Sequence, residues 1–245
     1  MTRTILVAAV LAVGLAARAD DAAVKVIEKA VKAHGGADAL KKHTGGEYKT
    51  EGTAVIAGET AKFTSVISYA LPDKFKMTFD TTVLDQKSSV VVIVNGDKVK
   101  ETANGKPAEV KEPVKAEFKQ LAANQEVSLL YPLLDKDKFT LKAEPTEKVD
   151  GKEAAVVLAT RKGMKDVKLF FDADSGRLVK YTRKGLNPLS QEVDEEVLMS
   201  EFKEFSGVLL PTAQKVRQGG KDYMTLKVTD VKLTDKPDVK AFAID

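Results

Sequence analysis

An alternation of apolar and polar residues, repeated along most of the chain, limits the possible folds more than any other feature. Between residues 61 and 71, Phe63, Ile67 and Tyr69 lie on one side of an extended chain, with polar residues between them. The same spacing recurs at residues 75–79 and 167–171. Because successive side chains of a strand point to opposite faces of a sheet, these runs predict strands with one apolar face. The expected inward-facing set is Phe63, Ile67, Tyr69, Phe75, Met77, Phe79, Leu169 and Phe171.

Short turn sequences that contain glycine separate these runs. Asn-Gly and Asp-Gly pairs favour the positive φ angles that a tight hairpin requires. Roughly ten strands in hairpin order, with polar residues at alternate positions, predict an antiparallel sheet that is wet on one side. The turn sequences are Asn95-Gly96, Asn104-Gly105, Asp150-Gly151, Asp174-Ser175-Gly176 and Gly219-Gly220.

Two segments have the spacing of helices instead. The first begins at Asp20, carries Val24, Ile27 and Val31 on one stripe, and ends at the glycine pair 35–36. A short helical turn is expected directly after it, over residues 37–42. The second main helix begins near Pro113, which suits a first turn, and runs to about Leu130. Its apolar stripe comprises Val114, Phe118, Leu121 and Ala122.

Together these elements predict a mainly β fold of the α+β class. We expect a strongly curved antiparallel sheet, or half-barrel, with the two main helices on its concave face. The large inward-facing residues then have two possible roles. They could form an ordinary core beneath the helices, or they could line a cleft for an apolar ligand that the helices cover incompletely. Periodicity alone does not separate these interpretations.

The first nineteen residues have the features of a secretory signal peptide. Arg3 supplies a positive start, and residues 5–17 are uncharged and almost wholly apolar. The stretch closes on Ala17-Arg18-Ala19, which has the small residues that signal peptidase accepts. A spanning helix needs about 20 apolar residues, so the run is too short for a membrane anchor. We therefore expect cleavage after Ala19.

Composition excludes several classes of protein. The chain has no cysteine, which excludes disulfides, thiol catalysis and thiolate metal sites. Its formal charge is +3, and about +1 without the two arginines of the signal, so a basic nucleic-acid surface is not expected. No segment after the signal has the length and hydropathy of a membrane span. We expect residues 20–245 to form a single domain, located in the periplasm or outside the cell.

A search for catalytic or metal-binding residues is negative. His34 and His43 are the two histidines, and their spacing does not suit a metal pair on a helix, so surface or helix-end histidines are expected. Asp172 and Asp174 lack the remaining ligands of a calcium loop and indicate a hairpin turn. The acidic residues within 192–196 are expected to form a solvated strand edge. We therefore expect no cofactor, no metal, no catalytic residue and no enzymatic activity.

Two stretches of the C-terminal half carry a family resemblance. Residues 167–181 read as a strand, an Asp-Ala-Asp-Ser-Gly turn and a second strand, and residues 201–211 run from Glu-Phe through a glycine to Leu-Pro. With the order of signal, helix, strands, helix and strands, these stretches resemble the LolA/LolB-like superfamily, which includes outer-membrane lipoprotein-sorting proteins. The resemblance implies a half-barrel whose apolar concave face holds acyl chains or peptides. The second helix has no motif that aligns with the lid of the sorting carriers, so no individual ligand-binding residue is carried over.

Two functions follow from these features. The first is an exported carrier or chaperone that binds a lipid-like or lipoprotein acyl ligand in an apolar cleft between the sheet and the second helix. The second is a non-enzymatic sensor or scaffold domain that binds an envelope protein or peptide, through a sheet edge or the covering helices. Nucleic acid is not an expected partner. The expected ligand-binding residues are Phe63, Ile67, Tyr69, Phe75, Met77, Phe79, Phe118, Leu121, Leu169 and Phe171.

Overall fold

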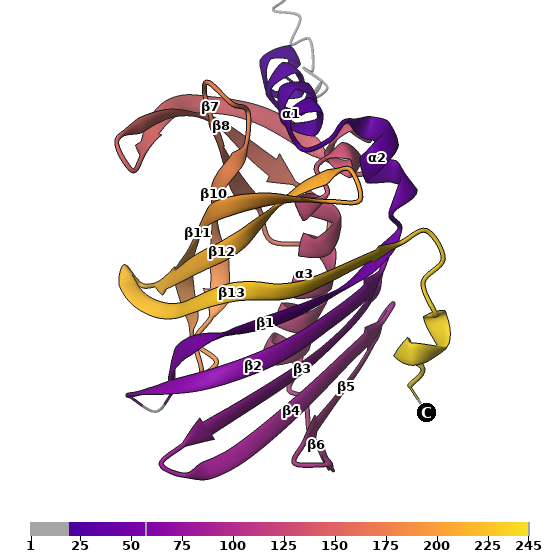
Figure 1. Ribbon diagram of the computed structural model, residues 1–245, viewed down its shortest axis with the longest axis vertical. Helices are drawn as coiled ribbons and strands as arrows, with labels where there is room; N and C mark the ends of the chain where they lie inside the picture. Colours follow the sequence, from indigo (N-terminus) through magenta and orange to yellow (C-terminus); the bar gives the residue numbers. More distant parts are fainter. Residues whose placement is uncertain (1–19, 57, 245) are drawn as a thin grey trace, which may run out of the picture.

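One antiparallel sheet of thirteen strands dominates the computed structural model, which describes residues 20–56 and 58–244 (Figure 1). The signal peptide expected at residues 1–19 lies outside the described residues. The elements are α1 (Asp21–Ala33), α2 (Ala37–Lys42), β1 (Gly45–Ile56), β2 (Glu59–Ala70), β3 (Lys74–Val83), β4 (Gln86–Asn95), β5 (Lys98–Ala103), β6 (Lys106–Ala108), α3 (Glu112–Ser128), η1 (Tyr131–Leu134), β7 (Thr140–Val149), β8 (Lys152–Thr160), β9 (Val167–Asp172), β10 (Leu178–Leu186), β11 (Glu192–Phe205), β12 (Val208–Gln218), β13 (Lys221–Thr234) and η2 (Val239–Phe242).

The sheet consists of two meanders that meet at one strand pair. Its order is β6-β5-β4-β3-β2-β1-β13-β12-β11-β10-β9-β8-β7, so β1 pairs with the last strand and the sheet is not closed. Every expected turn sequence lies at a hairpin, and Asp150 and Gly151 both have positive φ. The expectation of roughly ten strands was too low. Strands such as β5 (KVKETA) and β6 (KPA) are short and polar, so they lack the alternation by which a strand is recognised in a sequence.

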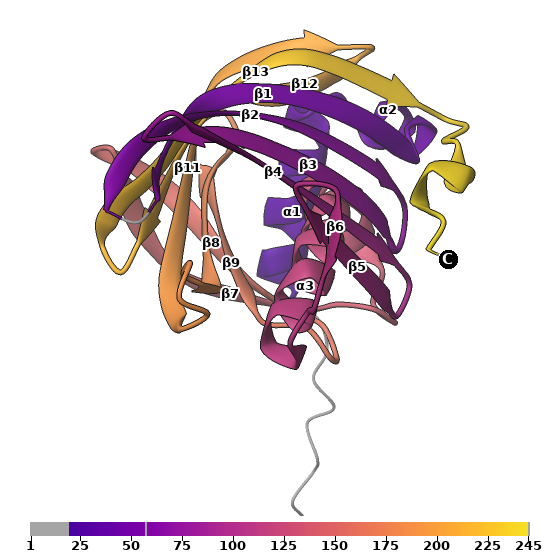
Figure 2. The same cartoon turned by 90° about the horizontal axis from the view of Figure 1, so that it is seen from below.

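The register confirms that the predicted apolar set shares one face. Directly opposed residues lie on the same face of a sheet, and Phe63, Ile67 and Tyr69 oppose Thr81, Met77 and Phe75. The rows continue through β1 and β13 to β11, where Val197 opposes Tyr181, which in turn opposes Leu169. This face is the concave one, and Figure 2 shows it arching over α1 and α3.

Each main helix covers one part of the concave face. Ile27, Ala30 and Val31 of α1 are buried in a cluster with residues of β7, β8 and β9, including Leu169 and Phe171. On the other side of the arch, α3 contacts β3, β4, β5 and β10, and a second cluster forms there around Phe75, Val92, Val94 and Ala122. No helix among the described residues is both long and apolar enough to cross a membrane.

The ends of α1 and α2 follow the sequence signals. Asp20 caps α1 by accepting a hydrogen bond from Ala22 N (2.9 Å), and the same residue joins α1 to the edge strand β7. Its N–H donates to the carbonyl of Leu141 (3.1 Å), and its carboxylate accepts from Ala143 N (3.1 Å). The glycine pair 35–36 has positive φ and ends the helix, and α2 spans the expected residues 37–42.

The face that α3 buries agrees only in part with the expected stripe, of which Ala122 is buried and Phe118 and Leu121 pack on the cluster around Phe75. Val114, Phe118 and Leu121 are partly exposed, whereas the buried residues lie further along the helix. Polar residues are among them because distant segments supply partners; Gln120 accepts a hydrogen bond from Lys165 N (2.8 Å), for example. The buried residues are Gln120, Ala122, Ala123, Asn124, Glu126 and Val127.

Both histidines stand at helix ends as expected, but neither is on the surface. His34 ends α1, is 4% exposed, and joins three segments. Its Nε2 accepts from Leu178 N (3.1 Å), so Nδ1 carries the proton and donates to the Leu209 carbonyl (2.8 Å). Burial lowers the pKa of His34; the hydrogen bond to Leu209 opposes this shift, and Arg177 adds to it. His43, also buried, ends α2 with Nε2 3.3 Å from the Ser206 carbonyl.

Acid should weaken the fold through His34. Because its folded-state pKa lies below the ordinary value of about 6.5, folding favours the neutral ring. This stabilisation is fully present above about pH 6.5 and is lost as the pH falls through the folded-state pKa. Urea unfolding from about pH 7.5 to about pH 5 should therefore show a larger loss of unfolding free energy for the native chain than for His34→Gln, which does not titrate. Equal losses in the two proteins would contradict this assignment.

Candidate ligand-binding face

Several apolar side chains in the middle of the concave face are partly exposed. The strip that they form lies between the two buried clusters, on strands that neither main helix covers fully (Figure 2). Phe79 belongs to this strip and stacks on Phe63 with ring centroids 4.7 Å apart. Inward-facing apolar side chains in water are costly, so this strip differs from an ordinary core. Its partly exposed members include Met77, Phe79, Val90, Met199, Leu226 and Val228.

The ten predicted ligand-binding residues divide between this strip and the core. Leu169, Phe171 and Tyr69 are buried beneath α1, and Phe75 is buried beneath α3. Phe63 is 4% exposed, although it stacks on the more accessible Phe79. The sequence placed all the strand residues on the correct face but could not show which of them the helices would cover. The remaining five, which are partly exposed, are Ile67, Met77, Phe79, Phe118 and Leu121.

A buried ion cluster joins α3 to the opposite wall of the arch. Arg183 of β10 contacts Glu117 of α3 (Nη1 to Oε1, 2.6 Å) and Glu195 of β11 (Nη2 to Oε1, 2.7 Å). The side chains of Arg183, Glu117 and Glu195 are 2%, 11% and 10% exposed. Gln218 donates to the second oxygen of Glu195 (3.1 Å), and Gly185 leaves space for that carboxylate, which a Cβ would approach to 3.1 Å.

The expectation of a solvated acidic edge was therefore wrong for Glu195. Glu192 and Asp194 are exposed and pair with lysines, but Glu195 faces inward with Arg183. The sequence did hold a signal for this cluster. Arg183 lies on the inward side of β10, together with Tyr181 and Gly185. A charged residue on that side requires a buried partner of opposite sign.

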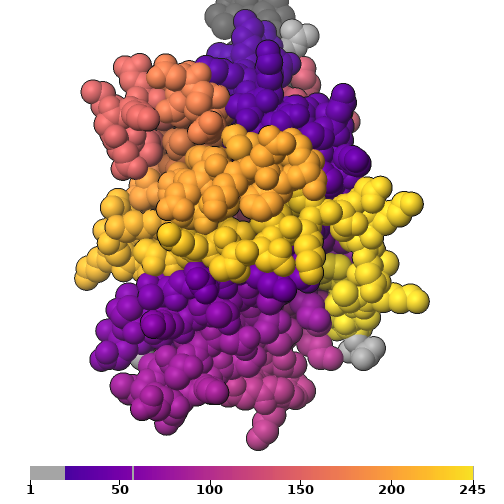
Figure 3. Space-filling view, in the orientation of Figure 1, coloured from indigo at the N-terminus to yellow at the C-terminus, as the bar shows by residue number. Residues whose placement is uncertain are grey.

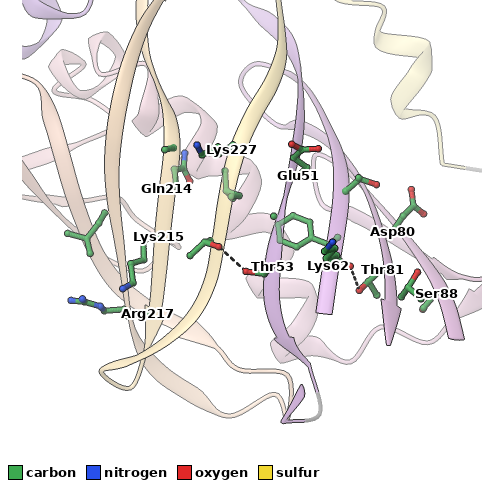
Figure 4. Close-up of a pocket in the computed structure, with 18 of the residues that line it drawn as sticks. Glu51, Thr53, Lys62, Asp80, Thr81, Ser88, Gln214, Lys215, Arg217 and Lys227 are labelled. Atoms are coloured by element: carbon green, nitrogen blue, oxygen red, sulfur yellow. Dashed lines mark hydrogen bonds between the residues drawn. The ribbon is translucent and has the colours of Figure 1, made fainter. Parts of the chain in front are cut away.

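A large hollow of about 1250 Å³ lies on the opposite, outward face of the sheet (Figure 4). Its floor is the backbone of one register row, and its walls are the outward-pointing residues on either side, among them Thr53, Lys62, Lys215 and Asp80. Figure 3 shows this face, on which β13 lies beside β1. The floor residues are Met199, Gln214, Leu226, Gly52, Phe63, Thr81 and Ser88.

This outward hollow is poorly suited to an acyl chain because many hydroxyl and charged groups stand in its walls, beside apolar residues such as Leu198 and Ala213. Thr53 and Thr225 share a hydrogen bond across it (2.9 Å), and Lys215 pairs with Asp222 beside it (2.8 Å). An apolar chain laid there would remove these polar groups from water without replacing their hydrogen bonds.

Two smaller hollows flank α3, and neither matches the expected cleft. One, of about 470 Å³, lies beside Leu71, Tyr131 and Lys138, and the other, of about 230 Å³, lies beside Val94 and Ala122. None of the three hollows is lined by Val114, Phe118 or Leu121. Phe118 and Leu121 pack on the cluster around Phe75 and Val92, where the helix contacts β3, β4 and β5.

Residues 20–56 and 58–244 contain no group of three or more histidine, aspartate or glutamate side chains placed to hold a metal ion. The candidate site consists of the apolar strip and of the ion cluster at one side of it.

Solved structures with the same fold were found, although the sequence itself matches no family model. No protein-family model matches the chain, and no curated protein matches it. A LolA-superfamily protein from Nitrosomonas europaea superimposes with a TM-score of 0.59 at 13% identity, over 91% of this chain and 97% of that one. A domain from Vibrio parahaemolyticus, described as an outer membrane lipoprotein-sorting protein domain, gives 0.56 at 11% identity, over 90% and 97%.

A DUF1329-family protein from Desulfovibrio piger gives a TM-score of 0.54 at 12% identity, over 90% of this chain and 95% of that one. Identities this low establish the architecture and nothing of the activity. The chain has a LolA-like fold, as its sequence motifs indicated.

Removing the arginine of the ion cluster should be severe. Arg183→Leu leaves two carboxylates buried without their cation, which should cost about 3–5 kcal/mol of unfolding free energy. Lys142→Leu is a suitable control, because Lys142 pairs with Glu144 on the surface and its side chain is 69% exposed. Urea unfolding should show no measurable change for this control. A comparable change in the two variants would show that the buried cluster has no special role.

Proposed function

We propose that this chain, which has the LolA-like fold, is an exported, non-enzymatic carrier that holds an acyl chain against the concave face of its sheet. The observation that carries the proposal is the partly exposed apolar strip between the two buried clusters. An acyl chain placed along Phe79, Met199 and Leu226 would cover these side chains and remove them from water. Each buried methylene of such a ligand contributes about 0.8 kcal/mol, so a long chain gains substantial affinity.

The proposed site lies further along the concave face than the cleft beside Val114, Phe118 and Leu121 that the sequence predicted. It is the open strip under the arch, and α3 forms one of its sides. The helix rests on β3, β4 and β5 and reaches β10 through the pair of Glu117 and Arg183, so it crosses the opening of the arch. A ligand would lie between this helix and strands β1, β11 and β13. Export is proposed from the apolar start of the sequence, which the structure does not describe.

The alternative function, recognition of a peptide at a sheet edge, has less support. Edge strand β6 has three residues, one of which is Pro107, and proline cannot donate to an added strand. At the other edge, Asp20 occupies the hydrogen-bonding groups of Leu141 and Ala143, and the register shifts around Pro145. Both edges are thus obstructed in the ways by which proteins prevent strand addition.

Polar substitution in the strip should abolish acyl binding with little loss of stability. Leu226→Gln keeps a side chain of similar size but places an amide where the chain would lie, and we expect at least tenfold weaker binding of a neutral fluorescent acyl probe. Because Leu226 is partly exposed and belongs to neither buried cluster, the unfolding midpoint should change little. Val239→Ser, at an exposed position of η2, is the matched control and should leave binding unchanged.

Phe79 distinguishes a pocket wall from a packed core. If Phe79 is part of a pocket wall, Phe79→Leu should mainly alter the affinity for the probe. If Phe79 is part of a packed core, the same substitution should mainly lower the unfolding free energy of the protein. Phe79→Asp should abolish binding and also reduce stability, because it places a charge beside Phe63. If the native chain binds no acyl probe at any concentration below the probe's own aggregation limit, the carrier proposal is wrong.

A further inference from the structure

The ion cluster beside the apolar strip carries an excess of negative charge. Glu117 and Glu195 contribute two carboxyl groups, and Arg183 contributes one guanidinium, so the cluster has two acidic groups for one basic group. The second oxygen of Glu117, Oε2, is buried and has no hydrogen-bond partner among the described residues, and the same holds for Nε of Arg183. Buried charge is screened far less than surface charge, so its field extends into the space beside it.

The cluster lies at the end of the same face that forms the proposed site. Glu195 is on β11, two residues from Val197 and four from Met199, on the same side of the strand. At about 3.3 Å per residue, these positions lie about 7 and 13 Å from Glu195 along the strand. The head group of an acyl chain on Met199 and Leu226 therefore lies within reach of the cluster.

Neighbouring side chains agree with a negative environment there. Burial raises the pKa of Tyr181 to about 12; Glu195 adds to the rise and Arg183 opposes it. The pKa of Tyr223 is also raised, first by burial and then by Glu195. The nearby lysines do not offset this charge, because Lys180 and Lys184 alternate to the outward face and already pair with Glu196 (3.3 Å) and Asp194 (2.6 Å).

We propose that the concave face selects its ligand by head-group charge, and that it takes amphiphiles with a cationic amine head and rejects those with a free carboxylate. This inference rests on the proposed function, since it assigns a ligand class to the same strip. A carboxylate head would bring a third acid beside Glu117 and Glu195. An ammonium head would balance the cluster and supply donors for the carboxylate oxygens of these two residues.

The test compares three ligands with the same chain and different heads. Dodecylamine, dodecanol and dodecanoate would each displace a neutral fluorescent probe from the native chain, near neutral pH and below their aggregation limits. At that pH the amine is protonated and the acid is ionised. We expect the amine to bind most tightly and the carboxylate most weakly, with at least a tenfold difference in Kd between them.

Two variants connect this order to the cluster. Glu117→Gln keeps an oxygen that accepts from Arg183 but makes the cluster neutral, and it should reduce the ratio of amine to carboxylate affinity at least threefold. Glu195→Gln should act in the same direction. Glu126→Gln is the matched control, because Glu126 is a buried glutamate of the same helix that pairs with Arg161 (2.6 Å) and Lys138 (3.2 Å) away from the strip. It should leave the ratio unchanged.

The outcomes separate the two proposals. If dodecanol binds but the amine and carboxylate bind equally, or the carboxylate binds more tightly, charge selection is wrong and the carrier remains. If Glu126→Gln changes the ratio as much as Glu117→Gln, the assignment to this cluster is wrong. If neither the neutral probe nor dodecanol binds the native chain, the carrier function itself fails. Unfolding curves for each variant would show that a lost preference is not a lost fold.

Discussion

Two helices are too few to cover the concave face of this sheet, and most of the molecule's other features depend on that shortage. Thirteen strands spaced by about 4.8 Å extend about 58 Å around the arc from one edge to the other. A helix is only about 10–12 Å across, and α1 and α3 are about 20 and 25 Å long. Each helix therefore builds its own cluster, and the strip between the clusters keeps apolar residues in partial contact with water. The outward hollow has a volume of about 1250 Å³, but hydroxyl and charged groups stand among its lining residues, so the inner strip is the better candidate for an apolar ligand.

Much of the fold was predictable because its signals are local. The pleat fixes which side of a strand each residue faces, so the inward set from Phe63 to Phe171 could be read from spacing alone. Asp20 and the glycines at 35 and 36 mark the ends of α1 by their own conformational preferences. The face buried by α3 could not be found this way. Gln120 and Glu126 are buried because Lys165 and Arg161 meet them from a loop far along the chain.

The candidate site was predictable to the level of the face and no further. Leu169 and Phe79 have the same pattern in the sequence, yet α1 buries the first and leaves the second partly exposed. That difference depends on where the helices rest, which is a long-range property. The same applies to His34 and Glu195, two residues that resemble ordinary surface groups in the sequence. Their burial follows from partners in β10 and β12 that only the folded sheet brings to them.

The pairing of β1 with β13 makes the whole sheet depend on the last strand of the chain. Until β13 has paired with β1, one edge of β1 has no neighbouring strand. In the same way, α1 cannot pack until β7 and β8 have formed, and these strands lie more than a hundred residues further along the chain. Such non-local contacts slow folding and leave an open edge on the growing first meander. The same arrangement makes the molecule divisible. A cut between β6 and α3 would yield two fragments, and each meander would present one strand, β1 or β13, by which it could recognise the other.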